Sequence, residues 1–543
     1  MVLGWLDLTV LAAYFVMTLA IGFWFGRRER NTHDFFLGGR RQHWLLAGVS
    51  IIATEISALT VIAVPGDAFK TDWSYLQMYA GSFLGRILIV FMLLPAFYGG
   101  AVTTVYEYLG QRFGPWTRTT ASLMFFASRI FGSGIRLLVA SLAVAEIFQW
   151  PLVGVVGAAT GVAMIYATYG GIKAILWTDA FQALVFVSAA VTLIVVIFLY
   201  IPGHYSQNFG DAYYAGKLHT FTGGISLSSE KGFWLLTIHS VFVTMAAMGT
   251  DQDLTQRMLT CPNLRQSRRA LIFNAIAGFP IVCTFLFVGS MLWAYYESRP
   301  FENVPDRVLE QEALILPYFI AHGLPRNLGL QGLMVAAIFA AAMSSLSSAI
   351  GALASTAVTD IYRPLVCALK PLSPTGGEGR VVILSEAKDL CPLSPSGGEG
   401  RVRGYADALL VGASRSEAHY LRVARSFTVF FGFILIFVAL AFHAEESLLW
   451  AVFKWVGLVF GGMLGVFVLG VTTRRRGRDG INALAMLSSV GVLVALKLYQ
   501  DAAETVYIAW PWWIVIGTVW TYIFGALFPT RRPSIDSRTS RLA

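Results

Sequence analysis

Charged residues are scarce in this chain. Asp, Glu, Lys and Arg make up 13% of its 543 residues, whereas 56% are hydrophobic. This share of charged residues is too small to form the surfaces of the several soluble domains that a chain of this length would otherwise suggest. Apolar runs long enough to cross the roughly 30 Å of bilayer hydrocarbon recur from end to end, and helices alone satisfy their backbone there. The sequence therefore predicts an all-α polytopic membrane protein.

Cysteine is also rare. Its four positions fall in predicted cytoplasmic connections or within a span, namely Cys261, Cys283, Cys367 and Cys391. Cytoplasmic thiols stay reduced, so we expect no disulfide framework.

Three motifs that would indicate other chemistry are missing. The sequence has no G-x-x-x-x-G-K-[ST] phosphate loop, no H-E-x-x-H or other metal-ligand spacing and no TVGYG-like filter. These absences argue against a single-chain ATP-driven pump, a transition-metal site and a potassium channel. We expect no enzymatic activity and no cofactor, and we expect an ion gradient to supply the energy for uphill transport.

Thirteen crossings are predicted, at residues 5–26, 43–66, 77–98, 117–148, 152–169, 178–201, 233–249, 268–296, 328–360, 423–443, 447–472, 481–499 and 511–528. Lys and Arg concentrate in alternate connections, so the positive-inside rule places the N-terminus outside and the C-terminus, with its tail 529–543, in the cytoplasm. Arg27, Arg28 and Arg30 follow the first crossing as a stop-transfer signal. We therefore expect a multi-pass inner (plasma) membrane protein whose first segment, 1–26, is retained.

One polar region interrupts the membrane pattern. The segment PLSPTGGEGRV at 371–381 returns almost unchanged as PLSPSGGEGRV at 392–402. This duplication is low in complexity and has no apolar face, so we interpret 371–420 as a disordered cytoplasmic insertion; a regulatory docking loop is the alternative.

Polar residues interrupt the second predicted crossing. Thr54, Glu55, Ser57 and Thr60 lie in its apolar run, and Pro65-Gly66 follows. A broken helix whose free carbonyls coordinate a cation would have this pattern. A Pro-Gly kink that neighbouring helices satisfy is the alternative.

Oxygen-bearing side chains also occur in the sixth and ninth crossings. Asp179 lies in an apolar helix, where an acid is usually paired or bound to a cation; a salt bridge to an intramembrane Arg is the alternative. In the ninth crossing, Ser344 shares a helix face with Ser347 and Ser348. Three hydroxyls and one carboxylate suit sodium, although close helix packing also explains small residues.

Two arginines lie on one face of the fourth crossing. Arg129 and Arg136 are seven residues apart. One could pair with Glu55, and one could bind an anionic substrate through its planar fork. A purely structural ion pair is the alternative.

Taken together, the runs AAAMSSLSSAIGALASTAVTDIYRP, WTDAFQ, ATEISALTVIAVP and GTDQDLTQRMLT resemble the sodium:solute symporter family. The resemblance implies a leucine-transporter-type core of two inverted five-helix repeats, 43–201 and 233–472, with one helix before it and two after it at 481–528. It implies a first sodium site at Ala53, Ile56, Ala341, Ser344 and Ser345. A second site would comprise Asp179, Ser344, Ser347 and Ser348.

The resemblance also implies substrate contacts, which fall on Glu55, Thr60, Arg136, Asp251 and Gln252. Leu59 and Thr60 depart from the sugar-transporting members, and SALTVIAVPGDAF is more similar to the iodide, monocarboxylate and vitamin branch. The predicted function is sodium-coupled import of a small organic or anionic solute by alternating access. The expected partners are one or two sodium ions, the solute and the lipid bilayer, without nucleic acid or an obligatory protein partner. Proton coupling through Glu55 and Asp179, or a transporter-like membrane sensor, are the alternatives.

Overall fold

The computed structural model describes residues 3–26, 29, 31–200, 205–221, 223, 232–297, 304–368, 416–441, 448–473 and 478–528. The predicted tail 529–543, Cys391, Arg27, Arg28, Arg30 and all but the end of the 371–420 insertion lie outside these residues. Cys261 and Cys283 are free thiols.

Every regular element in the described ranges is a helix. The first half of the chain forms α1 (Trp5–Gly26), α2 (Thr32–Leu37), α3 (Trp44–Glu55), α4 (Val64–Lys70), α5 (Gln77–Leu88), α6 (Leu94–Gly99), α7 (Val105–Arg112), α8 (Pro115–Phe148), α9 (Leu152–Tyr200) and α10 (Tyr205–Tyr214). The second half forms α11 (Phe233–Gly249), α12 (Gln252–Leu259), α13 (Leu264–Glu297), α14 (Asp306–Glu310), α15 (Glu312–His322), α16 (Leu330–Thr356), α17 (Arg363–Ala368), α20 (Glu417–Ala441), α21 (Leu448–Thr472), α22 (Asp479–Ala502) and α23 (Pro511–Leu527). Short 3-10 and π turns join some of them, at η1 (Gly38–Arg40), η2 (Leu59–Ala63), η3 (Ser74–Leu76), η4 (Ile89–Leu93) and η6 (Ala357–Tyr362).

Several helices are long enough to cross a bilayer. In the described part of the chain, eight helices have the length and apolar composition of a membrane span, and two bent pairs raise this number to ten. The 49-residue α9 is about 70 Å long at 1.5 Å per residue, more than twice a bilayer's hydrocarbon thickness. It is broken at Gly171, where φ is 55° and ψ is −156°. This break falls between the predicted crossings 152–169 and 178–201, while the total of thirteen crossings stays a prediction.

The outer surface of the bundle is apolar. Large side chains such as Trp24, Leu199 and Phe437 are about two-thirds exposed or more. A soluble protein rarely leaves so many large apolar groups in water, whereas lipid is their natural solvent. The exposure pattern therefore agrees with the membrane class predicted from composition.

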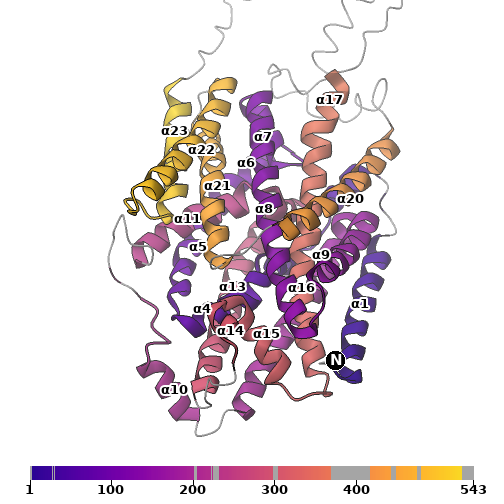
Figure 1. The fold of residues 1–543 in the computed structure, drawn as a ribbon. Coiled ribbons are helices and arrows are strands. Elements are labelled where there is room, and N and C mark those ends of the chain that lie inside the picture. The colour runs from indigo at the N-terminus through magenta and orange to yellow at the C-terminus, as the bar shows by residue number, and fades with distance from the viewer. Residues whose placement is uncertain are drawn as a thin grey trace, which may run out of the picture.

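The serine-rich α16 runs through the middle of the bundle (Figure 1). Almost every residue of this helix is buried, and it packs against α1, α3, α8, α9 and α20. Its alanines and serines allow these neighbours to approach closely, as small residues do in membranes. The long apolar helices therefore surround a polar stripe at the centre of the protein.

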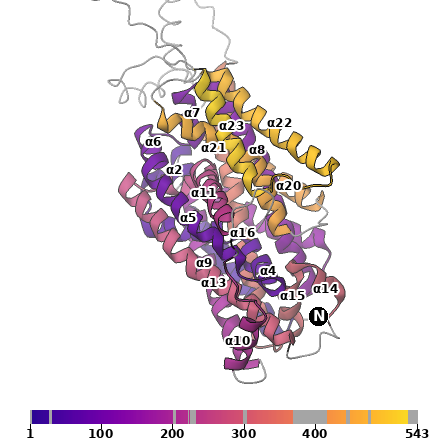
Figure 2. The same cartoon turned by 90° about the vertical axis from the view of Figure 1, so that its left-hand side faces the viewer.

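The helices α10, α14 and α15 lie at the same end of the bundle as the N-terminus (Figures 1 and 2). There α15 packs against α4. A Cβ on Gly66 would lie 2.0 Å from the backbone oxygen of Glu312, so the helices approach this closely because residue 66 is glycine. Pro65-Gly66 thus lies at a packing site within α4, whereas the helix itself breaks earlier, at Ile56.

A shielded carboxylate lies between α1 and α2, outside the spanning helices. Burial raises the pKa of Glu29 to about 7, although Lys173 lies 3.3 Å from its Oε1 atom and opposes the shift. The native state therefore binds a proton that the unfolded chain releases, so the contribution of Glu29 to stability is present below about pH 4.5 and is lost as pH rises through about 7.

We accordingly expect Glu29→Gln to reduce the loss of thermal stability between pH 5.5 and 8.5. The expected difference is on the order of 1 kcal/mol, since the carboxylate is partly screened by solvent. Melting curves of both proteins at the two pH values check this, with the exposed Glu504→Gln as control. An unchanged pH dependence in Glu29→Gln would contradict it.

Candidate functional site

The predicted break in the second crossing is confirmed. Helix α3 ends at Glu55, Ile56 leaves helical geometry with φ −79° and ψ 84°, and the chain resumes through η2 and α4 at an angle of 58°. The backbone N–H of Ser57 donates to the Glu55 carbonyl, and that of Thr60 donates to the Ser57 carbonyl at 2.9 Å. Such a break frees backbone carbonyls at membrane depth, where another polar group has to satisfy them.

Helix α16 supplies polar groups at this break. Ser345 Oγ donates to the Thr54 carbonyl at 3.3 Å, and Thr54 Oγ1 lies 3.2 Å from Ser348 Oγ. The two helices that carry the predicted first sodium site therefore lie side by side, and Ala53, Ile56, Ala341, Ser344 and Ser345 are all buried. The structure does not test whether the carbonyls of Ala53, Ile56 and Ala341 bind sodium, so this ligand set stays a prediction.

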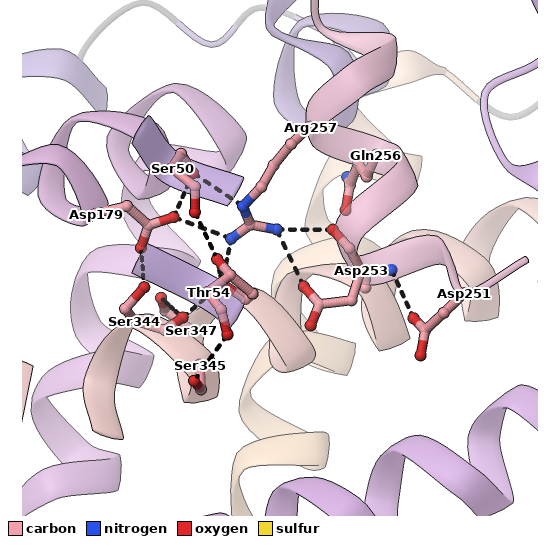
Figure 3. Close-up of polar contacts among 12 residues, drawn as sticks. Ser50, Thr54, Asp179, Asp251, Asp253, Gln256, Arg257, Ser344, Ser345 and Ser347 are labelled. Atoms are coloured by element: carbon pink, nitrogen blue, oxygen red, sulfur yellow. Dashed lines mark hydrogen bonds and ion pairs between the residues drawn. The ribbon is translucent and has the colours of Figure 1, made fainter. Parts of the chain in front are cut away.

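Asp179 faces the break from α9 (Figure 3). It is fully buried, and it accepts hydrogen bonds from Ser50 Oγ at 2.5 Å and from Ser344 Oγ at 2.7 Å. Ser347 Oγ instead donates to the Ser344 carbonyl of its own helix at 3.2 Å. The structure thus brings Asp179 and Ser344 of the predicted second sodium site together, while Ser347 makes no hydrogen bond to the carboxylate.

The intramembrane arginine that could pair with Asp179 is present, and it is Arg257 of α12. Its Nη2 atom lies 3.0 Å from Asp179 Oδ2 and also donates to Ser348 Oγ. Its Nε atom donates to Ser50 Oγ at 2.8 Å. Figure 3 shows the guanidinium between the serine cluster and Asp253, whose Oδ1 lies 3.0 Å from Nη1. Arg257 therefore joins the Asp179 cluster to α12.

The charge network continues from α12 to α8. Arg129 pairs with Asp251 and with Asp253, whose Oδ2 lies 2.9 Å from Nη1. Asp251 also caps α12 by accepting from the Asp253 backbone N–H at 2.9 Å. All these groups are buried, where removal of one partner leaves a costly unpaired charge.

The hypothesis that Arg129 or Arg136 pairs with Glu55 is wrong. Glu55 pairs with Arg86 of α5, and its other oxygen accepts from Asn274 Nδ2 at 2.8 Å. Arg86 Nε in turn donates to Asn274 Oδ1 at 2.8 Å. Two neighbouring helices, α5 and α13, thus satisfy the carboxylate, so it does not need an arginine of α8.

A cavity of about 180 Å³ lies between the broken helices and α5, α8, α11 and α21. Four of the predicted substrate contacts line it, namely Glu55, Thr60, Arg136 and Asp251. The fifth, Gln252, is not among the lining residues: it accepts from the Val105 N–H at 3.0 Å and donates to the Thr103 carbonyl at 3.2 Å. Its amide holds the start of α7 instead.

Arg136 differs from the other charged residues of this cavity. Glu55, Arg129, Asp251 and Asp253 each have an oppositely charged partner. Arg136 makes no ion pair with any described residue, and its Nε atom is buried without a hydrogen-bond partner. A half-buried cation without a partner favours a negatively charged ligand.

The second broken pair, α11 and α12, was not predicted. The two helices meet at 60° at Thr250 and Asp251. Gly249 before the break and the N-cap Asp251 after it are ordinary helix-stop and helix-start signals. Asp253 and Arg257, spaced for an i,i+4 ion pair, could have indicated a helix there rather than a loop.

Comparison with known proteins then identifies the chain. The model of the sodium:solute symporter family matches residues 35–368. The chain belongs to this family. It is therefore a multi-pass membrane protein and a sodium-coupled symporter rather than an enzyme, and sodium is its coupling ion. In its described part, no group of three or more His, Cys, Asp and Glu residues could hold a metal ion.

Two similar proteins illustrate the breadth of the family. This symporter is 29% identical over 530 residues to the sodium/sialic acid symporter NanT of Aliivibrio fischeri, covering 96% of this chain and 93% of that one. It is 27% identical over 360 residues to human sodium-coupled monocarboxylate transporter 2, covering 66% of this chain and 58% of the human protein. The second similarity agrees with the predicted branch.

Solved structures confirm the predicted fold class. A substrate-bound, outward-open sodium-coupled sialic acid symporter superposes with a TM-score of 0.79 at 25% identity, covering 97% of this chain and all of that one. The nucleobase-cation-symport-1 family transporter Mhp1 superposes with a TM-score of 0.51 at 12% identity, over 91% and 95% of the two chains, and so shares the fold alone. The symporter thus has the all-helical leucine-transporter-type fold, while the boundaries of the two inverted repeats stay predictions.

Proposed function

We propose that this symporter imports a small organic anion that carries a carboxylate, and that Arg136 binds this carboxylate in the central cavity. The observation that carries the proposal is the unpartnered Arg136 guanidinium among cavity residues whose charges are all paired. A guanidinium presents two parallel donors to a carboxylate, which gives both affinity and orientation. The names of the similar proteins agree, because sialic acid and monocarboxylates are both carboxylic acids.

The charge balance of the buried network favours an anion taken up with sodium. Asp179, Asp251 and Asp253 carry three negative charges, and Arg129, Arg136 and Arg257 carry three positive ones. A sodium ion added near Asp179 makes this set positive by one charge. A monovalent carboxylate at Arg136 offsets that charge, so each ligand lowers the electrostatic cost of binding the other.

Two sodium sites are proposed, as the family resemblance implies. The first comprises Ala53, Ile56, Ala341, Ser344 and Ser345 at the helix break, and the second comprises Asp179, Ser344, Ser347 and Ser348. In the second site, sodium would compete with Arg257 for Asp179 and Ser348, since both cations need the same oxygens. The Arg257 contact also reaches Asp253 of the cavity, which gives a physical route by which sodium binding alters the solute site.

The transport cycle follows from this coupling. With the N-terminus outside and the C-terminus in the cytoplasm of the plasma membrane, sodium and solute enter from the outside, and alternating access releases them inward. Two sodium ions with a monovalent anion carry one net charge, worth about 2.3 kcal/mol per 100 mV, or about fiftyfold accumulation. One sodium ion would make transport electroneutral, so the second site decides whether the membrane potential contributes.

Thermal stabilisation of the purified symporter tests the substrate class. We expect lactate or sialic acid to raise the melting temperature by about 2–5 °C at a hundredfold excess over Kd in sodium chloride, because a ligand of the native state alone stabilises it. Lactamide, the neutral analogue of lactate, and the same ligands in potassium chloride should have no effect. Stabilisation by neutral solutes alone, or equally in both salts, would overturn the proposal.

A further inference from the structure

A second arginine without a partner lies on the outer surface of the bundle. Arg425 of α20 makes no hydrogen bond or ion pair with any described residue, and its Nε atom is shielded from solvent. It lines a groove of about 580 Å³ between α1, α9 and α20, which shares no lining residue with the transport cavity. These three helices lie together at one side of the bundle in Figure 1, with α9 packed against both others.

The walls of this groove are apolar along most of its length. Phe23 of α1, Ile165 of α9 and Val429 of α20 are between one-third and one-half exposed there. Gly161 forms part of the α9 wall, and a Cβ built on it would have no heavy atom within 4 Å, so the groove is open at that point. Since these helices cross the membrane, the groove faces lipid chains rather than water.

Two polar residues of the groove, Arg425 and Thr168, lie near one end of it. Arg425 is eight residues after the start of α20, and Thr168 is three residues before the break of α9 at Gly171. The Thr168 hydroxyl, like Arg425 Nε, is buried without a hydrogen-bond partner. The start of α20 and the break of α9 both lie at the cytoplasmic face in the orientation proposed above. The groove therefore offers hydrogen-bond donors at the membrane interface and an apolar channel that leads into the bilayer.

We propose that this groove binds an anionic phospholipid of the cytoplasmic leaflet, with its phosphate at Arg425 and Thr168 and one acyl chain along Phe23, Ile165 and Val429. An unpaired guanidinium and a hydroxyl complement a phosphate diester, and the adjoining apolar walls complement an acyl chain. The charge nearby favours an anionic headgroup: Arg422 precedes Arg425 by three residues, and Glu29, which also faces Arg425, is paired with Lys173. Basic clusters at the cytoplasmic end of spanning helices recognise anionic lipids in this way.

Native mass spectrometry of the delipidated protein with equimolar phosphatidylglycerol and phosphatidylcholine tests the site. The wild type should retain phosphatidylglycerol about tenfold better than phosphatidylcholine, the effect of one charge-assisted hydrogen bond. Arg425→Gln should bring phosphatidylglycerol down to the phosphatidylcholine level, whereas Arg269→Gln, which changes an exposed arginine of α13 outside the groove lining, should retain it.

A second pair of variants tests the acyl channel. Gly161→Leu should fill the groove and lower the retention of both lipids several-fold, whereas Gly157→Leu, equally open but outside the groove lining, should not. Millimolar inorganic phosphate should displace neither lipid. Equal retention of the two lipids by the wild type, equal losses in the two arginine variants, or displacement by phosphate would overturn the lipid site. Melting curves verify that each variant is folded.

Discussion

Replacing Arg136 by Gln is expected to weaken carboxylate binding by about thirtyfold or more while leaving the protein folded. Loss of a buried charge pair with a ligand costs about 2–5 kcal/mol. No described residue makes a hydrogen bond or ion pair with Arg136, so its removal leaves no direct partner unpaired. Arg136→Lys, which keeps the charge but not the planar fork, should lose about tenfold. Ligand titrations followed by melting temperature measure these affinities.

Arg129→Gln is the matched comparison, seven residues away on the same helix. Because Arg129 holds both Asp251 and Asp253, its removal should cost about 3–5 kcal/mol of stability. The two variants therefore separate a ligand-binding arginine from a structural one. If Arg136→Gln binds the carboxylate within threefold of wild type, or is destabilised as much as Arg129→Gln, the proposed role of Arg136 is wrong.

The second large effect is expected in the Asp179 cluster. Ser344→Ala removes a hydroxyl that lies 2.7 Å from Asp179 and belongs to both proposed sodium sites. We expect the sodium concentration for half-maximal transport to rise about tenfold, the effect of one lost interaction with a charged group. Asp179→Asn should in addition lower the Hill coefficient for sodium from about two to about one. Sodium titration of transport in proteoliposomes measures both quantities.

Ser355→Ala is the control for this cluster. Ser355 is also buried in α16, but its hydroxyl donates to the Ala352 carbonyl of its own helix at 2.9 Å. Sodium dependence should be unchanged in this variant. If Ser344→Ala leaves sodium dependence intact, or if transport by the wild type follows pH rather than sodium, proton coupling through the carboxylates would replace the sodium sites.

The break in the second crossing and the contact between Asp179 and Ser344 could be predicted from the sequence because each has a local signal. Pro65-Gly66 after a polar run indicates a broken helix, and an acid or a row of serines at membrane depth needs partners. These signals are strong because lipid makes an unsatisfied polar group expensive, so few arrangements are allowed.

The pairing of charges could not be predicted in the same way. Glu55 faces Arg86 rather than Arg129, and Asp179 faces Arg257, because α5 and α12 approach these carboxylates only in the folded bundle. Arg257 falls in the connection between the predicted crossings 233–249 and 268–296. The break at Thr250 and Asp251 turns α12 back into the protein, and that bend is a tertiary feature without a local signal for the pairing.

Uptake into proteoliposomes measures sodium-coupled carboxylate transport itself. Radiolabelled carboxylate, chosen as the ligand that stabilises the protein, is offered with an inward gradient of sodium chloride or of potassium chloride at equal pH. We expect transient accumulation above equilibrium with sodium, none with potassium and none with Arg136→Gln. Equal uptake in the two salts, or sodium-driven uptake that survives in Arg136→Gln, would contradict sodium-coupled carboxylate transport through this cavity.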